Sequence, residues 1–240
     1  MYMLDLPAHE QQLYERLPAG WGGRWYGVFP AQVIDIKDPD NQGRLKVTLP
    51  WAPDAQGGRY EAWARLATMF GGNNRGSWFI PDVDDEVLVA VEQGDARRPY
   101  VLGELSNGRD GAPESMDGGG RNFKKVLCSR NGVKITLDDQ DGQEKLVLET
   151  PGGQRITLKD GPGMVEVVDS NGNSIKLEPA GITVTTAAKV TVNASQVAVS
   201  AGLVTVDAGM STFSGVVKAD TVISNSVISA SYTPGAGNIW

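Results

Sequence analysis

The last sixty residues of the chain, 181–240, constrain its fold most, because they combine very little charge with short-range alternation of apolar residues. Only four of their side chains are charged: Lys189, Asp207, Lys218 and Asp220. Apolar pairs separated by one residue recur along them: Ile182/Val184, Val190/Val192, Val197/Val199 and Val204/Val206. The pattern is typical of many short strands that bury one face. A segment with so little charge is expected to form one side of a larger structure, and not a complete single-chain domain.

Length and composition narrow the possible classes. The 240 residues leave room for one large domain or two modest ones. A net charge of −7 argues against a nucleic-acid binder, which needs a basic footprint. The single cysteine, Cys128, excludes a disulfide within the chain, and we expect it to be buried or structural. The start of the chain lacks the basic and apolar regions of a signal peptide, so we expect assembly in the bacterial cytoplasm.

Composition divides the chain into five parts. Residues 1–24 are expected to form an N-terminal arm with a short amphipathic helix. Residues 25–108 contain five or six strand patterns and no convincing helix, which predicts a small closed or half-closed barrel. The expected strands are 28–36, 45–49, 62–66, 86–92 and 99–105. Residues 109–122 are a glycine-rich linker.

The fourth part, residues 123–231, carries a loose repeat. Ile135, Ile156 and Ile175 occupy equivalent positions, 21 and then 19 residues apart, each in a strand that follows a turn. From Ile182 the period shortens to seven or eight residues. Such units are too short to close a coil by themselves, since a single-chain solenoid needs about 20 residues per coil. Three chains winding together would bury the inward valines and pair the strand edges. We therefore expect an all-β protein whose C-terminal part is an intertwined, trimeric β-helix.

Few residues suggest catalysis. His9 is the only histidine, and no Gly-x-Ser-x-Gly nucleophile elbow is present. The acidic runs 82–86 and 138–141 are better explained as turns than as catalytic pairs. The glycine-rich stretch 71–76 lacks the Gly-Lys-Ser/Thr of a phosphate loop and is expected to be a flexible loop. We predict that the chain is not an enzyme and uses no cofactor and no metal.

The fifth part, residues 232–240, breaks the strand pattern and ends on an aromatic residue. A terminal Trp beside Ile usually packs onto something, so this segment would close the end of a rod or bind another protein. The alternative is a disordered tail. The candidate partner-binding residues are Tyr232, Pro234, Asn238, Ile239 and Trp240.

An ordered series of motifs between residues 38 and 108 resembles the OB-fold domain of phage baseplate assembly protein V and the VgrG spikes. The series is Asp38-Pro39, Gly43-Arg44-Leu45-Lys46-Val47, Pro50-Trp51, Trp63-Ala64-Arg65-Leu66-Ala67, Gly76, Trp78-Phe79-Ile80-Pro81, Asp85-Glu86-Val87-Leu88-Val89, Gly94-Asp95, Arg98-Pro99, Val101-Leu102-Gly103 and Asn107-Gly108. The similarity continues less specifically through residues 124–148.

This resemblance implies a homotrimeric central spike under the tail tube of a contractile injection machine. Such a spike attaches to a hub, pierces the target envelope when the sheath contracts, and does not bind nucleic acid. Three differences from the family matter. Only about 25 residues precede the barrel, so we expect a separate hub protein. Residues 109–121 are too few to hold the lysozyme domain that some spikes carry. No histidine follows His9, so the iron-binding tip of some spikes is not expected. The last difference favours a separate PAAR-type tip protein near Trp240.

Two other functional classes remain open from the sequence. A trimeric adhesin or tail fibre would share the β-rod but not the barrel motifs. A glycan-cleaving β-helix would need acidic residues on a groove, whereas acids are scarce after Glu178. The sequence does not distinguish a phage tail from a tailocin or another injection particle.

Overall fold

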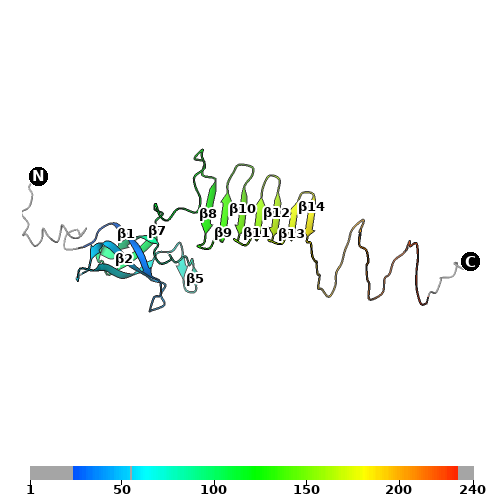
Figure 1. Ribbon diagram of the computed structural model, residues 1–240, viewed down its shortest axis with the longest axis horizontal. Coiled ribbons are helices and arrows are strands. Elements are labelled where there is room, and N and C mark those ends of the chain that lie inside the picture. The colour runs from blue at the N-terminus through cyan, green and yellow to red at the C-terminus, as the bar shows by residue number, and fades with distance from the viewer. Residues whose placement is uncertain (1–23, 55, 232–240) are drawn as a thin grey trace, which may run out of the picture. The chain divides into compact units, whose positions relative to one another are not determined.

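The computed structural model describes residues 24–54 and 56–231, and this part of the chain is all-β (Figure 1). The N-terminal helix expected within residues 1–24 lies outside the described residues, except for Arg24. No helix among the described residues is long and apolar enough to span a membrane.

A closed five-stranded barrel follows the sequence prediction closely. Its strands are β1 (Val28–Asp35), β2 (Leu45–Pro53), β3 (Arg59–Leu66), β6 (Glu86–Val91) and β7 (Pro99–Glu104), in the order β1-β2-β3-β7-β6. β3 and β7 pair in parallel, and the other neighbours are antiparallel. This closure removes the free strand edges that an open sheet would present.

Alternation along these strands builds the barrel core. Val33, Val47, Val87, Val89 and Val101 have no exposed surface, because every second side chain of a strand points to the same side. Trp25 extends the core through an edge contact with Phe29, at 5.8 Å between ring centroids, and a tilted contact with Tyr60 at 5.3 Å.

The connection from β3 to β6 corrects one prediction. Residues 71–76, expected to be a flexible loop, form a two-stranded hairpin of β4 (Gly71–Gly72) and β5 (Arg75–Gly76). Asn74, the second residue of the connecting turn, takes a positive φ of 52°, a conformation that asparagine adopts more readily than most residues. The backbone N–H of Ser77 donates to the Phe70 carbonyl at 3.1 Å and closes the base of the hairpin. A short 3₁₀ turn, η2 (Glu92–Gly94), joins β6 to β7.

The repeat region folds as a seven-stranded antiparallel sheet in which each strand pairs with its neighbours in sequence (Figure 1). Its strands are β8 (Lys124–Cys128), β9 (Lys134–Asp138), β10 (Lys145–Glu149), β11 (Arg155–Lys159), β12 (Met164–Val168), β13 (Ser174–Glu178) and β14 (Gly181–Thr185).

A recurring turn explains the repeat in the sequence. Gly132, Gly153 and Gly172 have φ values of 86°, 88° and 82°, a region that side chains other than glycine rarely adopt. The N–H of each glycine donates to the carbonyl three residues earlier, which is the geometry of a tight hairpin turn. One left-handed glycine therefore returns the chain at each repeat, and the predicted repeat is confirmed.

The glycine-rich segment after the barrel is fixed by two carboxylates. Asp117 accepts the backbone N–H groups of Gly119, Arg121 and Asn122 at 2.8–3.1 Å, and these bonds hold its pKa below the usual range. The Glu114 carboxylate lies 3.3 Å from Lys124 Nζ and 3.9 Å from Lys134 Nζ. The segment is therefore attached to the first two strands of the sheet through Glu114.

Two further expectations differ from the structure. Cys128 is exposed and not buried, because β8 is the edge strand and no layer covers it in the single chain. The short strands expected after β14 are absent from residues 186–231, where the chain runs between regularly spaced bends. A strand needs a hydrogen-bonded neighbour, and the single chain offers none to this segment.

The turn between β1 and β2 is organised by Asp38, whose side chain is almost entirely buried. Its carboxylate accepts the backbone N–H groups of Asp40, Gln42 and Arg44, and it also accepts from the Arg44 guanidinium at 2.6 Å. These donors, with the Arg44 guanidinium first, hold the pKa of Asp38 well below its usual range. One carboxylate therefore replaces the missing regular hydrogen bonds of this turn.

We expect Asp38→Asn to lower the unfolding temperature of the barrel more than Asp40→Asn, because Asp40 contributes only a contact with Arg44. The low pKa of Asp38 means that its stabilising effect is present above the unfolded-state pKa of about 4 and is lost as the pH falls below it. Thermal unfolding between neutral and acidic pH checks both points. Equal melting temperatures for the two variants, or a wild-type advantage that persists in acid, would contradict this role.

Candidate assembly interface

One face of the seven-stranded sheet is apolar across its whole width. The strand register aligns the apolar side chains into two rows that run across neighbouring strands. The first row is Leu127, Ile135, Leu148, Ile156, Val167, Ile175 and Val184. The second is Leu137, Leu146, Leu158, Val165, Leu177 and Ile182. Lys125 takes the second row's position on the edge strand β8, where a charge discourages further strand pairing.

The opposite face of the sheet carries most of its polar and charged side chains, together with Val126 and Val147. Asp138 and Lys145 face each other across β9 and β10 with 3.3 Å between their charged groups. Lys176 lies opposite Glu166 in the register and 2.6 Å from the Glu178 carboxylate, and Glu178 raises the pKa of the lysine. The Asp138–Lys145 pair joins two strands and stabilises this face, on which Thr136, Asp138 and Thr157 are buried. Pairs of this kind do not account for the exposed side chains of the apolar face.

Nothing in the described residues covers the apolar face. Ile156 is 38% exposed and Val184 57%, although side chains of this kind are normally buried in a folded domain. A sheet with one apolar face must pack against another layer. The missing layer has to come from outside the described part of the chain.

The segment after the sheet leaves its apolar side chains even more exposed. Val190, Val197 and Val204 are each 60–65% exposed, and their partners two residues on are more exposed still. The segment forms its own unit from residue 190 onward and makes no strand pairing among the described residues. Within each pair the two valines point the same way, because residues two apart in an extended segment do so. The apolar sheet face and, independently, the valine pairs of residues 190–206, which we call the valine side, are the candidate assembly surfaces.

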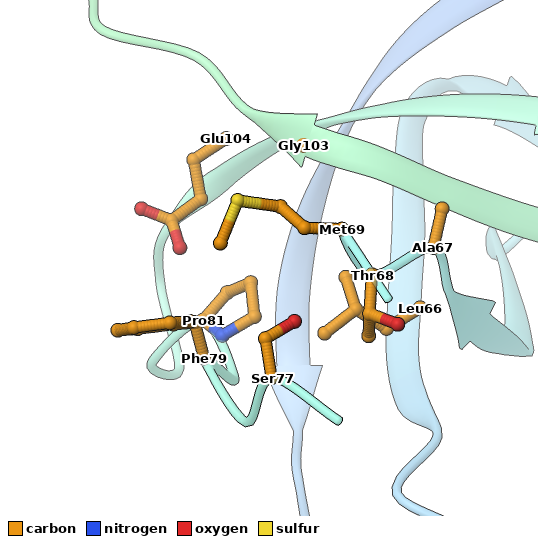
Figure 2. Close-up of a pocket in the computed structure, with 9 residues that line it drawn as sticks. All are labelled: Leu66, Ala67, Thr68, Met69, Ser77, Phe79, Pro81, Gly103 and Glu104. Atoms are coloured by element: carbon orange, nitrogen blue, oxygen red, sulfur yellow. The ribbon is translucent and has the colours of Figure 1, made fainter. Parts of the chain in front are cut away.

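The barrel has a separate shallow pocket of about 180 Å³, shown in Figure 2. Its walls are mostly apolar, and Glu104 contributes the one ionisable side chain. Burial raises the pKa of Glu104, with smaller contributions from the nearby Asp85 and Asp82 carboxylates. The lining residues are Leu66, Ala67, Thr68, Met69, Ser77, Phe79, Pro81, Gly103 and Glu104. Thr68 and Ser77 add hydroxyls to this lining, and the Thr68 hydroxyl donates to the backbone carbonyl of Phe70 at 3.1 Å.

The acidic runs noted in the sequence lie in turns, as predicted. The Asp85 carboxylate accepts the backbone N–H of Asp82 at 2.7 Å, and Asp84 takes a positive φ of 78°. Residues 139–144 connect β9 to β10, with the N–H of Gln143 bonded to the Gln140 carbonyl. No group of three or more His, Cys, Asp or Glu side chains in the described ranges is placed to hold a metal ion. His9 and the predicted partner-binding residues Tyr232, Pro234, Asn238, Ile239 and Trp240 lie outside the described residues.

Sequence reasoning identified the valines after residue 181 but not the two rows on the sheet. The sequence did not show which face of the strand Leu146, Val147 and Leu148 occupy, because all three are apolar. The pairing with Thr157 and Thr136 places Val147 on the polar face. The register between strands, which the sequence does not show directly, was needed to see a continuous surface.

Comparison with known families gives both regions a counterpart. Residues 29–105 match the model of the type VI secretion system/phage-baseplate injector OB domain, which coincides with the barrel. Residues 145–210 match the phage baseplate V C-terminal trimerisation domain, which begins at β10 and extends into the valine-rich segment. A barrel of the injector type followed by a trimerisation domain defines a baseplate or spike protein.

Individual relatives agree with this class. The chain is 28% identical over 113 residues to the type VI secretion system spike protein VgrG1a of Pseudomonas aeruginosa, which is 44% of this chain and 18% of that protein. It is 30% identical over 112 residues to VgrG3 of Vibrio cholerae, 44% of this chain and 11% of that protein. A further relative is the actin cross-linking toxin VgrG1 of Vibrio cholerae, at 25% identity over 112 residues. The chain thus spans less than a fifth of the length of these relatives.

The resemblance seen in the motifs is confirmed, and the chain belongs with the VgrG-like baseplate and spike proteins. The trimerisation match also accounts for the uncovered apolar face, since two further copies would supply the missing layers.

Two adjacent residues on β11 test this interface. Leu158 is in the second apolar row, and Lys159 points to the polar face. We expect Leu158→Asp to remove about 2 kcal/mol of apolar burial per chain and to place three unpaired carboxylates in the interface of each trimer. The variant should dissociate at concentrations where the wild type remains trimeric in sedimentation analysis.

Lys159→Asp is the matched control, because it introduces the same side chain one residue away on the opposite face. It should stay trimeric. If both variants dissociated equally, or if neither did, the apolar rows would not be the surface that holds the copies together.

Proposed function

We propose that the chain is the structural central spike of a contractile tail or injection-machine baseplate and acts as a homotrimer without enzymatic activity. It attaches below a tube and hub and punctures the target cell envelope when the sheath contracts. The observation that carries this proposal is the valine side of residues 190–206, which is at least 60% exposed in a single chain. A segment of this kind becomes a stable rod only when identical copies cover it.

The proposed organisation follows the five parts of the sequence. Residues 25–108 form the hub-proximal barrel, residues 109–122 connect it, and residues 123–231 form a trimeric β-helix that serves as the needle. Residues 1–24 and 232–240 are an arm and a tip segment. The spike assembles in the bacterial cytoplasm and becomes part of a phage tail or another injection particle. The names of its relatives, which are spike proteins of type VI secretion systems, support this assignment.

Shape and mass test the proposal together. Light scattering should give three times the chain mass of 25.6 kDa, and negative-stain images should show a short club with a narrow needle. A folded monomer would refute the spike. A trimeric adhesin or tail fibre, the main alternative, would share the rod but not the barrel motifs, so the closed barrel favours the spike.

The tip segment is proposed to bind a PAAR-type tip protein through Tyr232, Pro234, Asn238, Ile239 and Trp240. Deletion of Gly235 through Trp240 should abolish co-purification with such a protein expressed together with the spike, because it removes the terminal aromatic platform. The trimer mass should not change, since the interface rows lie earlier in the chain. Unchanged co-purification would place the partner's binding site elsewhere.

A further inference from the structure

The period of the chain shortens within the unit that begins at residue 190. Bends occur at residues 195, 202 and 209, seven residues apart, and then at 215, 220, 225 and 230, mostly five apart. The short repeats 221–225 and 226–230 have nearly the same sequence, Thr-Val-Ile-Ser-Asn and Ser-Val-Ile-Ser-Ala. The apolar residues therefore change from alternate positions to adjacent ones.

Adjacent apolar residues have a consequence that alternate ones do not. Neighbouring side chains of an extended segment point to opposite sides, so Val222 and Ile223 cannot both face the interior of a rod. The same holds for Val227 and Ile228, and for Val216 and Val217. One member of each pair has to face outward.

Exposure in the single chain separates the two sides. Val217, Val222 and Val227 are 63–73% exposed, close to the range of the interface valines of the earlier repeats. One residue in each repeat is distinctly more exposed, at 82–98%. These residues form a set that we call the distal stripe: Leu203, Met210, Val216, Ile223 and Ile228. The two repeats before Leu203 have Lys189 and Gln196 in the corresponding place.

Two features of the segment suit a nonpolar medium. Only Asp207, Lys218 and Asp220 are charged between residues 203 and 231. The hydroxyls of Ser224 and Ser229 donate to the carbonyls of Ser226 and Ser231 at 2.7 and 2.6 Å. Hydroxyl donors satisfied by a backbone carbonyl two residues on do not need water, which lowers the cost of moving the segment into hydrocarbon.

We propose that the distal stripe faces outward from the trimer and contacts the acyl-chain region of a lipid bilayer. This inference rests on the proposed trimeric spike. Three-fold symmetry would repeat the stripe around the rod, which fits a medium that is apolar on all sides better than a single groove on a partner protein. The needle then has a polar outer surface in its first repeats and an apolar one in its last.

Flotation of the full-length protein with vesicles tests the proposal. Wild-type trimer should float with phosphatidylcholine vesicles whether or not they contain phosphatidylglycerol, because apolar contact does not depend on lipid charge. The combined variant Val216→Thr, Ile223→Thr and Ile228→Thr keeps β-branched side chains but loses apolar surface in all three chains. We expect its partition coefficient to fall by at least about tenfold.

The control removes three exposed apolar side chains outside the segment, by Tyr26→Thr, Val83→Thr and Met116→Thr. It should float like the wild type. Light scattering of every variant distinguishes failure of the trimeric spike from failure of the stripe. A monomeric wild type would refute the spike itself, whereas a trimer that does not float would refute only the stripe. Equal flotation of the stripe variant would also overturn the proposal. The proposal would also be overturned if wild-type trimers bound one another but not vesicles, and if the stripe variant lost that self-association.

Discussion

The architecture depends on apolar surface that one chain cannot bury. The barrel closes on itself and fills its interior with side chains such as Val47 and Val89. The seven-stranded sheet cannot do the same, because its apolar rows lie on a single face and the antiparallel register keeps them there. One polypeptide thus contains a self-sufficient domain and a region that is complete only as part of an assembly, and the burial of apolar area drives both.

The sequence predicted the barrel well because its signals are local. Alternation in 86–92 and 99–105 corresponds to β6 and β7, and the turn cluster at Asp38 lies between β1 and β2. The left-handed glycines of the repeat were equally visible, since Gly132 and Gly172 follow asparagine in similar contexts. Local chemistry decides such features, so they can be read without knowing what packs against them.

Features that depend on distant partners were harder to predict. Cys128 was expected to be buried or structural, but it lies on an edge strand that the single chain leaves uncovered. The hairpin of β4 and β5 was missed because its strands are two residues long and carry no alternation. The attachment of Glu114 to Lys124 and Lys134 joins residues whose proximity depends on the turn at Asp117. In the candidate interface the same limit applied, since the register and not the residue pattern assigned Val147 to the polar face.

The pairing of each strand only with its sequence neighbours fixes an order of assembly. Contacts from β8 to β14 are all local, so a single chain can form this sheet quickly, hairpin by hairpin. Residues 190–231 have no strand pairing among the described residues and, in the proposed trimer, gain it only from other copies. We expect the folded sheets to align the copies before this segment pairs. The turns of the sheet repeat one glycine geometry but differ in sequence, whereas units 221–225 and 226–230 are nearly identical, so the sheet specifies the alignment of copies less ambiguously.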